Sequence, residues 1–229
     1  MDTQLKTIKK IFDYKANSYH AQRKCIGILG VALPVVLAIG KIFFDIVILG
    51  SSKTGIESSI SSYYYTNMSG VFVGILCGIG IFLFSYLGPD PGDRRDNIAG
   101  NIACVSAVGV ALFPTMPANP GPLSTTIATI HFASAATFLL TLAYFSIFLF
   151  TRTDPNRRPT RRKLLRNKIY RSCGWTIIIT VILCIPAMQL PTNHWLDTCN
   201  PIFWLESTAV WAFGWSWLIK GEAILKDNE

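Results

Sequence analysis

Six apolar runs, each long enough to cross a bilayer as a helix, dominate this sequence. A transmembrane helix needs about 20 mostly apolar residues, with a usual range of roughly 17–25. In hydrocarbon the backbone hydrogen bonds must be satisfied within the spanning structure, and a helix does this on its own. The sequence therefore predicts an all-α integral membrane bundle of six transmembrane helices, at residues 25–49, 70–87, 97–114, 127–150, 172–190 and 201–219.

The composition points to the same class. Hydrophobic residues make up 51% of the 229 residues and charged residues only 15%, whereas soluble domains carry about 25% charged residues. The formal net charge of +8 comes from basic residues that lie between the apolar runs rather than on one folded surface. This pattern is typical of membrane topology, and it predicts membrane lipids rather than nucleic acid as partners.

Basic side chains orient the six runs. All but two of the 21 lysines and arginines fall before the first run, after the last, or in the segments that follow the second and fourth runs. Because cytoplasmic segments are enriched in Lys and Arg, both termini are expected in the cytoplasm, in a multi-pass protein of the bacterial inner membrane. The predicted parts are a basic tail at 1–24, a transmembrane domain at 25–219 and a second tail at 220–229. The first tail is predicted either as a short interfacial helix, with Leu5, Ile8 and Phe12 on one face, or as a solvated tail.

A Pro-rich turn separates the third and fourth runs. Pro114 and three further prolines in 115–126 prevent a helix from continuing. His131 lies one turn inside the fourth run and Glu206 a similar distance inside the sixth, both entered from the outer side. Ionisable residues at such depth mark functional sites by default, so we expect the pair either to share an outer pocket or to form a structural polar clamp. The pocket candidates are His131, Glu206, Asp45, Ser61, Tyr64 and Pro114.

A second polar group is expected on the cytoplasmic side. Basic residues near a membrane surface recognise anionic lipid headgroups, although topology and the start of a helix also account for charges there. The headgroup candidates are Arg94, Arg95, Asn101, Arg166 and Arg171.

Small residues mark one face of the second run. Gly70, Gly74 and Gly78 recur at intervals of four, a spacing that lets helix backbones approach closely. Packing inside the bundle is the preferred interpretation, and a homo-oligomer interface is the alternative.

The sequence lacks the common catalytic and metal-binding motifs. It contains no Gly-rich phosphate loop, no GxSxG and no HExxH, and its cysteines and histidines do not have metal-ligand spacing. We therefore predict no metal and no cofactor, and the motifs leave open whether the chain is an enzyme.

Two segments carry a resemblance to known proteins. They are Phe113-Pro114 at the end of the third run and His131-Phe132-Ala133-Ser134-Ala135-Ala136-Thr137-Phe138 in the fourth. Over roughly residues 55–150 the chain resembles an uncharacterised bacterial family of six-span membrane proteins. More loosely, it resembles the damage-regulated autophagy modulator type of eukaryotic protein. Trp204-Leu205-Glu206 and Phe213-Gly214-Trp215-Ser216-Trp217 are similar to the bacterial group only. The eukaryotic relatives are associated with lipid organisation and membrane trafficking, so the resemblance implies a role with lipid and transfers no catalytic residue.

The leading functional hypothesis is non-enzymatic: the chain binds or organises lipid, or a small amphiphile, through an outward-facing polar pocket. The second is an intramembrane lipid hydrolase or transferase, with His131 as general base and Glu206 orienting it. The third is an ion or proton pathway through the same two residues.

Overall fold

The computed structural model describes residues 2–52, 54–88, 93–153, 158–190 and 199–225, with side chains from residue 18 onward. Short π-helices continue the first and fourth α-helices, at Phe44–Ile48 and Phe145–Leu149, and a 3-10 helix, η2, covers Ser61–Tyr65. The described residues form no strand, so the prediction of an all-α fold is confirmed. The six α-helices are α1 (Asp2–Phe43), α2 (Ser69–Phe84), α3 (Arg95–Leu112), α4 (Ser124–Tyr144), α5 (Arg161–Ala187) and α6 (Pro201–Lys220).

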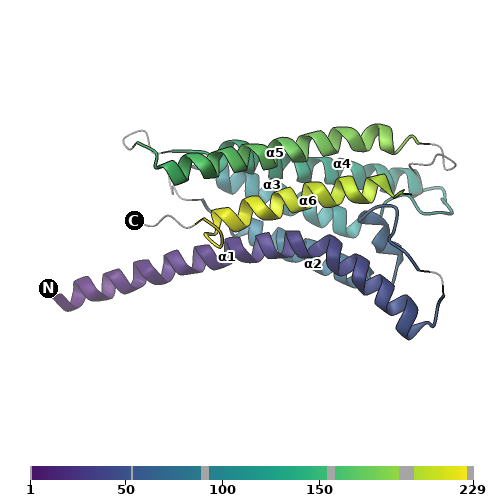
Figure 1. Ribbon diagram of the computed structural model, residues 1–229, viewed down its shortest axis with the longest axis horizontal. Helices are drawn as coiled ribbons and strands as arrows, with labels where there is room; N and C mark the ends of the chain where they lie inside the picture. The colour runs from purple at the N-terminus through teal and green to yellow at the C-terminus, as the bar shows by residue number, and fades with distance from the viewer. Residues whose placement is uncertain (1, 53, 89–92, 154–157, 191–198, 226–229) are drawn as a thin grey trace.

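The six helices pack as a ring in chain order, and α1 closes the ring against α6. Successive helices run in opposite directions, so the N- and C-termini lie at the same end of the bundle (Figure 1). We call this the terminal end, and it also holds residues 93–94 and 151–153. The opposite end, which we call the distal end, holds residues 50–52, 54–68 and 113–123.

Three of the helices are long and apolar enough to cross a membrane. They are Ser18–Ile48, Ser124–Leu149 and Arg161–Ala187. Helix α2 is apolar but shorter, with 16 residues. Helix α3 carries Arg95, Asp96 and Asn97 in its first turn, and α6 carries Glu206.

The helix boundaries follow the predicted runs except at the starts of α5 and α1. Helix α5 begins at Arg161, inside the predicted basic loop, because the Thr160 side chain caps it by accepting a hydrogen bond from the Lys163 N–H at 3.1 Å. Helix α1 begins at Asp2 and continues unbroken into the first apolar run. Figure 1 shows its first turns extending beyond the rest of the bundle.

Large apolar side chains cover the outside of all six helices. Soluble monomers rarely expose apolar patches larger than a few hundred Å², so an apolar exterior of this extent fits a hydrocarbon surrounding. Helices α2, α3 and α6 share this exterior with the three long helices. Examples, each at least 48% exposed, are Ile28, Ile81, Val105, Leu140, Ile182 and Trp215.

The interior at the terminal end is aromatic. The rings of Tyr86, Phe145, Phe150 and Trp217 are all fully buried. Their neighbouring centroids lie 5.0–5.8 Å apart, mostly edge to face. This arrangement suits the quadrupoles of aromatic rings and ties the start of the α2–α3 connection to the ends of α4 and α6.

The glycine stripe on α2 does not make the close helix contacts of the bundle, so the preferred interpretation of it is wrong for Gly70 and Gly74. A Cβ added at Gly70 or Gly74 would meet no other atom within 4 Å. The close approaches occur elsewhere: a Cβ at Gly100 would lie 2.4 Å from the Leu83 carbonyl oxygen, and one at Gly214 would lie 2.8 Å from the Gly27 carbonyl oxygen. Glycines on α3 and α6 therefore set the helix spacing. Gly70 and Gly74 face outward, and a Cβ at Gly78 would make only an ordinary contact, at 3.7 Å, with Leu29 of α1.

Candidate functional site

A short folded segment closes the distal end of the ring. We call residues 57–66, which include η2, the distal cap. Ile60, Ser61 and Tyr63 of this segment are buried, and the Tyr63 ring lies 6.2 Å from that of Phe203 on α6. The Tyr65 hydroxyl donates to the Thr115 carbonyl oxygen at 2.6 Å. The predicted outer loop is thus part of the folded interior.

His131 joins the distal cap to the end of α3. Its side chain is 1% exposed. Nδ1 lies 2.7 Å from the Phe113 carbonyl oxygen and Nε2 lies 3.0 Å from Ser61 Oγ. The Phe113 carbonyl is available because α3 ends at Leu112, and the residue before a proline is held in an extended conformation. The Phe113 carbonyl and the His131 side chain therefore contact each other across the Pro-rich turn.

Glu206 holds the other side of the same cap. Its Oε2 accepts a hydrogen bond from the Ile60 N–H at 2.6 Å. Nearby, the Phe203 N–H donates to the Ser58 carbonyl oxygen at 3.0 Å, which gives a partner to one of the unpaired amides at the start of α6. The cap is thereby attached to α6 through both backbone and side chain.

His131 and Glu206 lie at the same end of the bundle but contact neighbouring cap residues rather than each other. Ser61 and Ile60 separate the imidazole from the carboxylate. Two of the other pocket candidates lie at the same site: Ser61 bonds to His131, and Pro114 follows Phe113, whose carbonyl oxygen His131 also contacts. Asp45 bonds to Lys41 at 2.7 Å and to Thr54 at 3.0 Å, and Tyr64 packs its ring edge-on against Tyr65.

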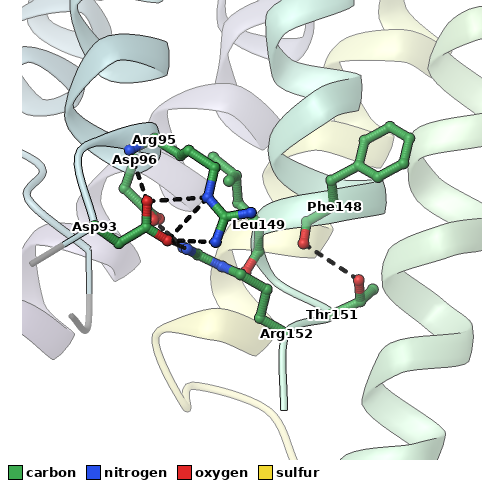
Figure 2. A network of polar contacts seen from close by, with 7 residues as sticks. All are labelled: Asp93, Arg95, Asp96, Phe148, Leu149, Thr151 and Arg152. Atoms are coloured by element: carbon green, nitrogen blue, oxygen red, sulfur yellow. Dashed lines mark hydrogen bonds and ion pairs between the residues drawn. The ribbon is translucent and has the colours of Figure 1, made fainter. Parts of the chain in front are cut away.

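A cluster of charged side chains lies at the terminal end. We call Asp93, Arg95, Asp96 and Arg152 the ion cluster (Figure 2). Arg152 donates hydrogen bonds from Nη1 to Asp93 and from Nη2 to Asp96. The Asp96 side chain is 2% exposed. Arg95 also bonds to Asp93, at 2.7 Å. Arg152 lies three residues after the π-helix Phe145–Leu149 that continues α4, so the ion cluster connects the end of this helix to the start of α3.

The ion cluster lowers the pKa of Asp93, and its Asp96 leaves room only for glycine at position 88. Hydrogen bonds from the Arg95 side chain and its backbone N–H, with the charge of Arg152, hold the pKa of the Asp93 carboxyl well below its usual value. Gly88 passes over Asp96 with a φ of +76°, and a Cβ there would lie 2.5 Å from Asp96 Cγ. Only glycine combines this backbone conformation with so close an approach.

The cytoplasmic headgroup candidates do not form one site. Arg94 and Arg95 lie at the start of α3, Asn101 is exposed one and a half turns further on, and Arg171 is exposed on α5. Arg166 faces the interior, 3.8 Å from Glu222. Three of the five candidates therefore lie at the start of α3 or within it, whereas Arg166 and Arg171 lie on α5.

A long groove runs between α3 and α4 on the outside of the bundle. It consists of two adjoining hollows of about 480 and 490 Å³ that share Ile102 and Thr137. Arg95 and Tyr144 line its terminal end, while the remaining walls are mostly apolar with some hydroxyl groups. By contrast, the cavity beneath the distal cap, lined in part by Ser61 and Glu206, is about 50 Å³.

Sequence reasoning missed Arg152 because a basic residue after a span has an obvious role in topology. The signal available was Asp96, an acid at the edge of an apolar helix that needs a partner. Among the described residues, no three His, Cys, Asp or Glu side chains come close enough to hold a metal ion.

Comparison of the chain with protein-family models, characterised proteins and solved structures finds no match. The resemblance to the bacterial six-span family therefore stays a prediction.

Proposed function

We propose that the chain is a six-span membrane protein, with its terminal end in the cytoplasm of a bacterial cell, that binds a membrane lipid along the α3–α4 groove. Two observations support six spans. The helices alternate in direction around one ring, and α2, α3 and α6 carry the same apolar exterior as the longer helices. The 20 residues of α6 extend about 30 Å, which equals the thickness of a hydrocarbon core.

The orientation has a direct test. We expect a cysteine at Arg158 to be protected from a membrane-impermeant maleimide in intact spheroplasts, and one at Ser52 to react, when the native cysteines are replaced by alanine. Both positions are exposed, at the terminal and distal ends respectively. Reaction at position 158 but not at 52 would reverse the proposed orientation, since the bias of basic residues is its main support.

The groove is the observation that carries lipid binding. Its two hollows, of about 480 and 490 Å³, are shallow and open on the outside of the bundle, where a lipid chain could lie along them. Apolar walls suit an acyl chain. The Arg95 guanidinium bonds to Asp93 but is 63% exposed at the terminal end of the groove, where it suits a lipid phosphate as well. The cavity under the distal cap, about 50 Å³, is too small to enclose a whole lipid molecule, so the proposed binding site differs from the outward-facing pocket that we expected.

Filling the groove should displace the lipid. Ile102 lines both hollows, so we expect Ile102→Trp to lower the fraction of protein that retains dioleoylphosphatidylglycerol several-fold. Native mass spectrometry of protein purified with that lipid gives the measurement. Ile28→Trp is the matched control, because Ile28 is an exposed residue of α1 outside the groove. Equal retention by the two variants would remove the groove as a lipid site.

A further inference from the structure

We propose that Ser61 and His131 form a nucleophile–base pair at the distal end that cleaves or transfers the carboxylic ester of a membrane amphiphile. The hydroxyl and the imidazole belong to residues 70 positions apart, yet Ser61 Oγ and His131 Nε2 lie 3.0 Å apart in a buried site. This activity does not depend on lipid binding in the α3–α4 groove, because it uses a separate site at the other end of the bundle.

The hydrogen bonds of His131 determine which of its two ring nitrogens carries the proton. The Phe113 carbonyl oxygen can only accept, so Nδ1, 2.7 Å away, carries the proton. In a neutral imidazole Nε2 is then the acceptor, and the Ser61 hydroxyl donates to it. A serine whose hydroxyl points at a correctly oriented base is the arrangement that activates serine as a nucleophile. Here a backbone carbonyl takes the orienting role that an acid has in many such sites.

Glu206 is a positioning residue in this site. Its carboxylate does not contact the imidazole; it holds the Ile60 N–H at 2.6 Å, one residue before the nucleophile. It therefore fixes the start of η2 and the direction of the Ser61 side chain. This differs from the role of His131 partner that the sequence suggested for it.

The walls beside Ser61 indicate the class of substrate. The cavity that Ser61 and Glu206 line is otherwise formed by aliphatic and aromatic side chains of five helices. Such walls exclude charged or sugar-like groups and accept the first carbons of an acyl chain.

The reaction has two balanced steps. Ser61 Oγ bonds to the ester carbonyl carbon while its proton passes to His131 Nε2. The bond to the alkoxy oxygen then breaks, and the leaving alcohol takes that proton. Water from the aqueous side of the cap next gives a proton to Nε2 and its oxygen to the acyl carbon. The fatty acid leaves as the proton returns to Ser61 Oγ, and an acceptor alcohol in place of water makes the same step a transfer.

An alkyl fluorophosphonate, which reacts covalently with activated serines, tests the proposal on the full-length protein in lipid nanodiscs. We expect an adduct that peptide mass spectrometry maps to Ser61. Ser61→Ala should abolish the adduct, and His131→Gln should slow its formation by roughly 100-fold, in line with the usual contribution of a general base. Ser62→Ala is the matched control and should leave the rate unchanged, because the Ser62 hydroxyl bonds to Ser59, at 2.7 Å, and not to the histidine.

The outcome on the unaltered chain decides the question even if a variant fails to fold. Absence of a Ser61 adduct, under conditions in which a known serine hydrolase is labelled, would overturn the proposal. Labelling of Ser61 at the same rate in a folded His131→Gln variant would overturn the role of His131 as base. Thermal unfolding of each variant in the same nanodiscs identifies those that are folded.

Discussion

Replacing Arg152 with glutamine is expected to lower the free energy of unfolding by about 3–5 kcal/mol, the usual cost of removing one partner from a buried ion pair. The Asp96 side chain is 2% exposed and bonds to Arg152. Without the guanidinium, the Asp96 carboxylate would stay buried with no compensating charge, and Asp93 would lose one of its two arginines. Reversible unfolding in mild detergent, monitored by circular dichroism, measures the loss.

A second substitution separates the ion pair from general damage. Asp96→Asn removes the buried charge, so the double variant Arg152→Gln/Asp96→Asn should be more stable than Arg152→Gln alone. Arg158→Gln changes an exposed arginine of the same connection and should alter stability by less than about 1 kcal/mol. If the two single changes in the ion cluster simply add, Arg152 and Asp96 do not depend on each other.

Gly100→Ala is expected to destabilise the bundle although it adds only one methyl group. The new Cβ would lie 2.4 Å from the Leu83 carbonyl oxygen, which is backbone of α2 and cannot rotate away. Helices α2 and α3 would have to separate, and overpacking of this kind costs about 1–3 kcal/mol. The same unfolding experiment gives the value.

Gly74→Ala is the matched control for Gly100→Ala, because it should not lower the stability of the bundle. No atom lies within 4 Å of a Cβ at Gly74, and alanine is the better helix former by about 1 kcal/mol. We therefore expect this variant to be as stable as the unaltered chain or slightly more so. Equal destabilisation by Gly74→Ala and Gly100→Ala would contradict the packing of α2 against α3 described here.

These glycines show where sequence reasoning reached its limit. Apolar runs of suitable length located all six helices, because helix formation in an apolar segment depends mainly on local composition. The face that each helix turns inward depends on its neighbours. Gly70, Gly74 and Gly78 have the spacing of a packing face, but Gly100 and Gly214, which have no such repeat, make the close contacts. Spacing within one helix does not carry this information.

The sequence predicted the two ionisable residues of the candidate site but not their partners. The cost of an ionisable side chain in an apolar run identified His131 and Glu206 and placed them at one end of the bundle. Their partners are the Phe113 carbonyl, the Ser61 hydroxyl and the Ile60 amide. Two of these three are backbone groups, and every residue has such groups. A segment that reads as a polar outer loop gives no sign that it folds back among the helices.

The way the ring closes has a consequence for synthesis of the chain. Residues of the distal cap leave the ribosome early, but Phe113, His131 and Glu206, which anchor it, follow much later. Helix α1, which is synthesised first, packs against α6, which is synthesised last. Both closures are completed by the last helix to be made. A nascent chain that stops before α6 would therefore present an unanchored cap and the uncovered faces of α1 and α5 to the machinery that removes unassembled membrane proteins.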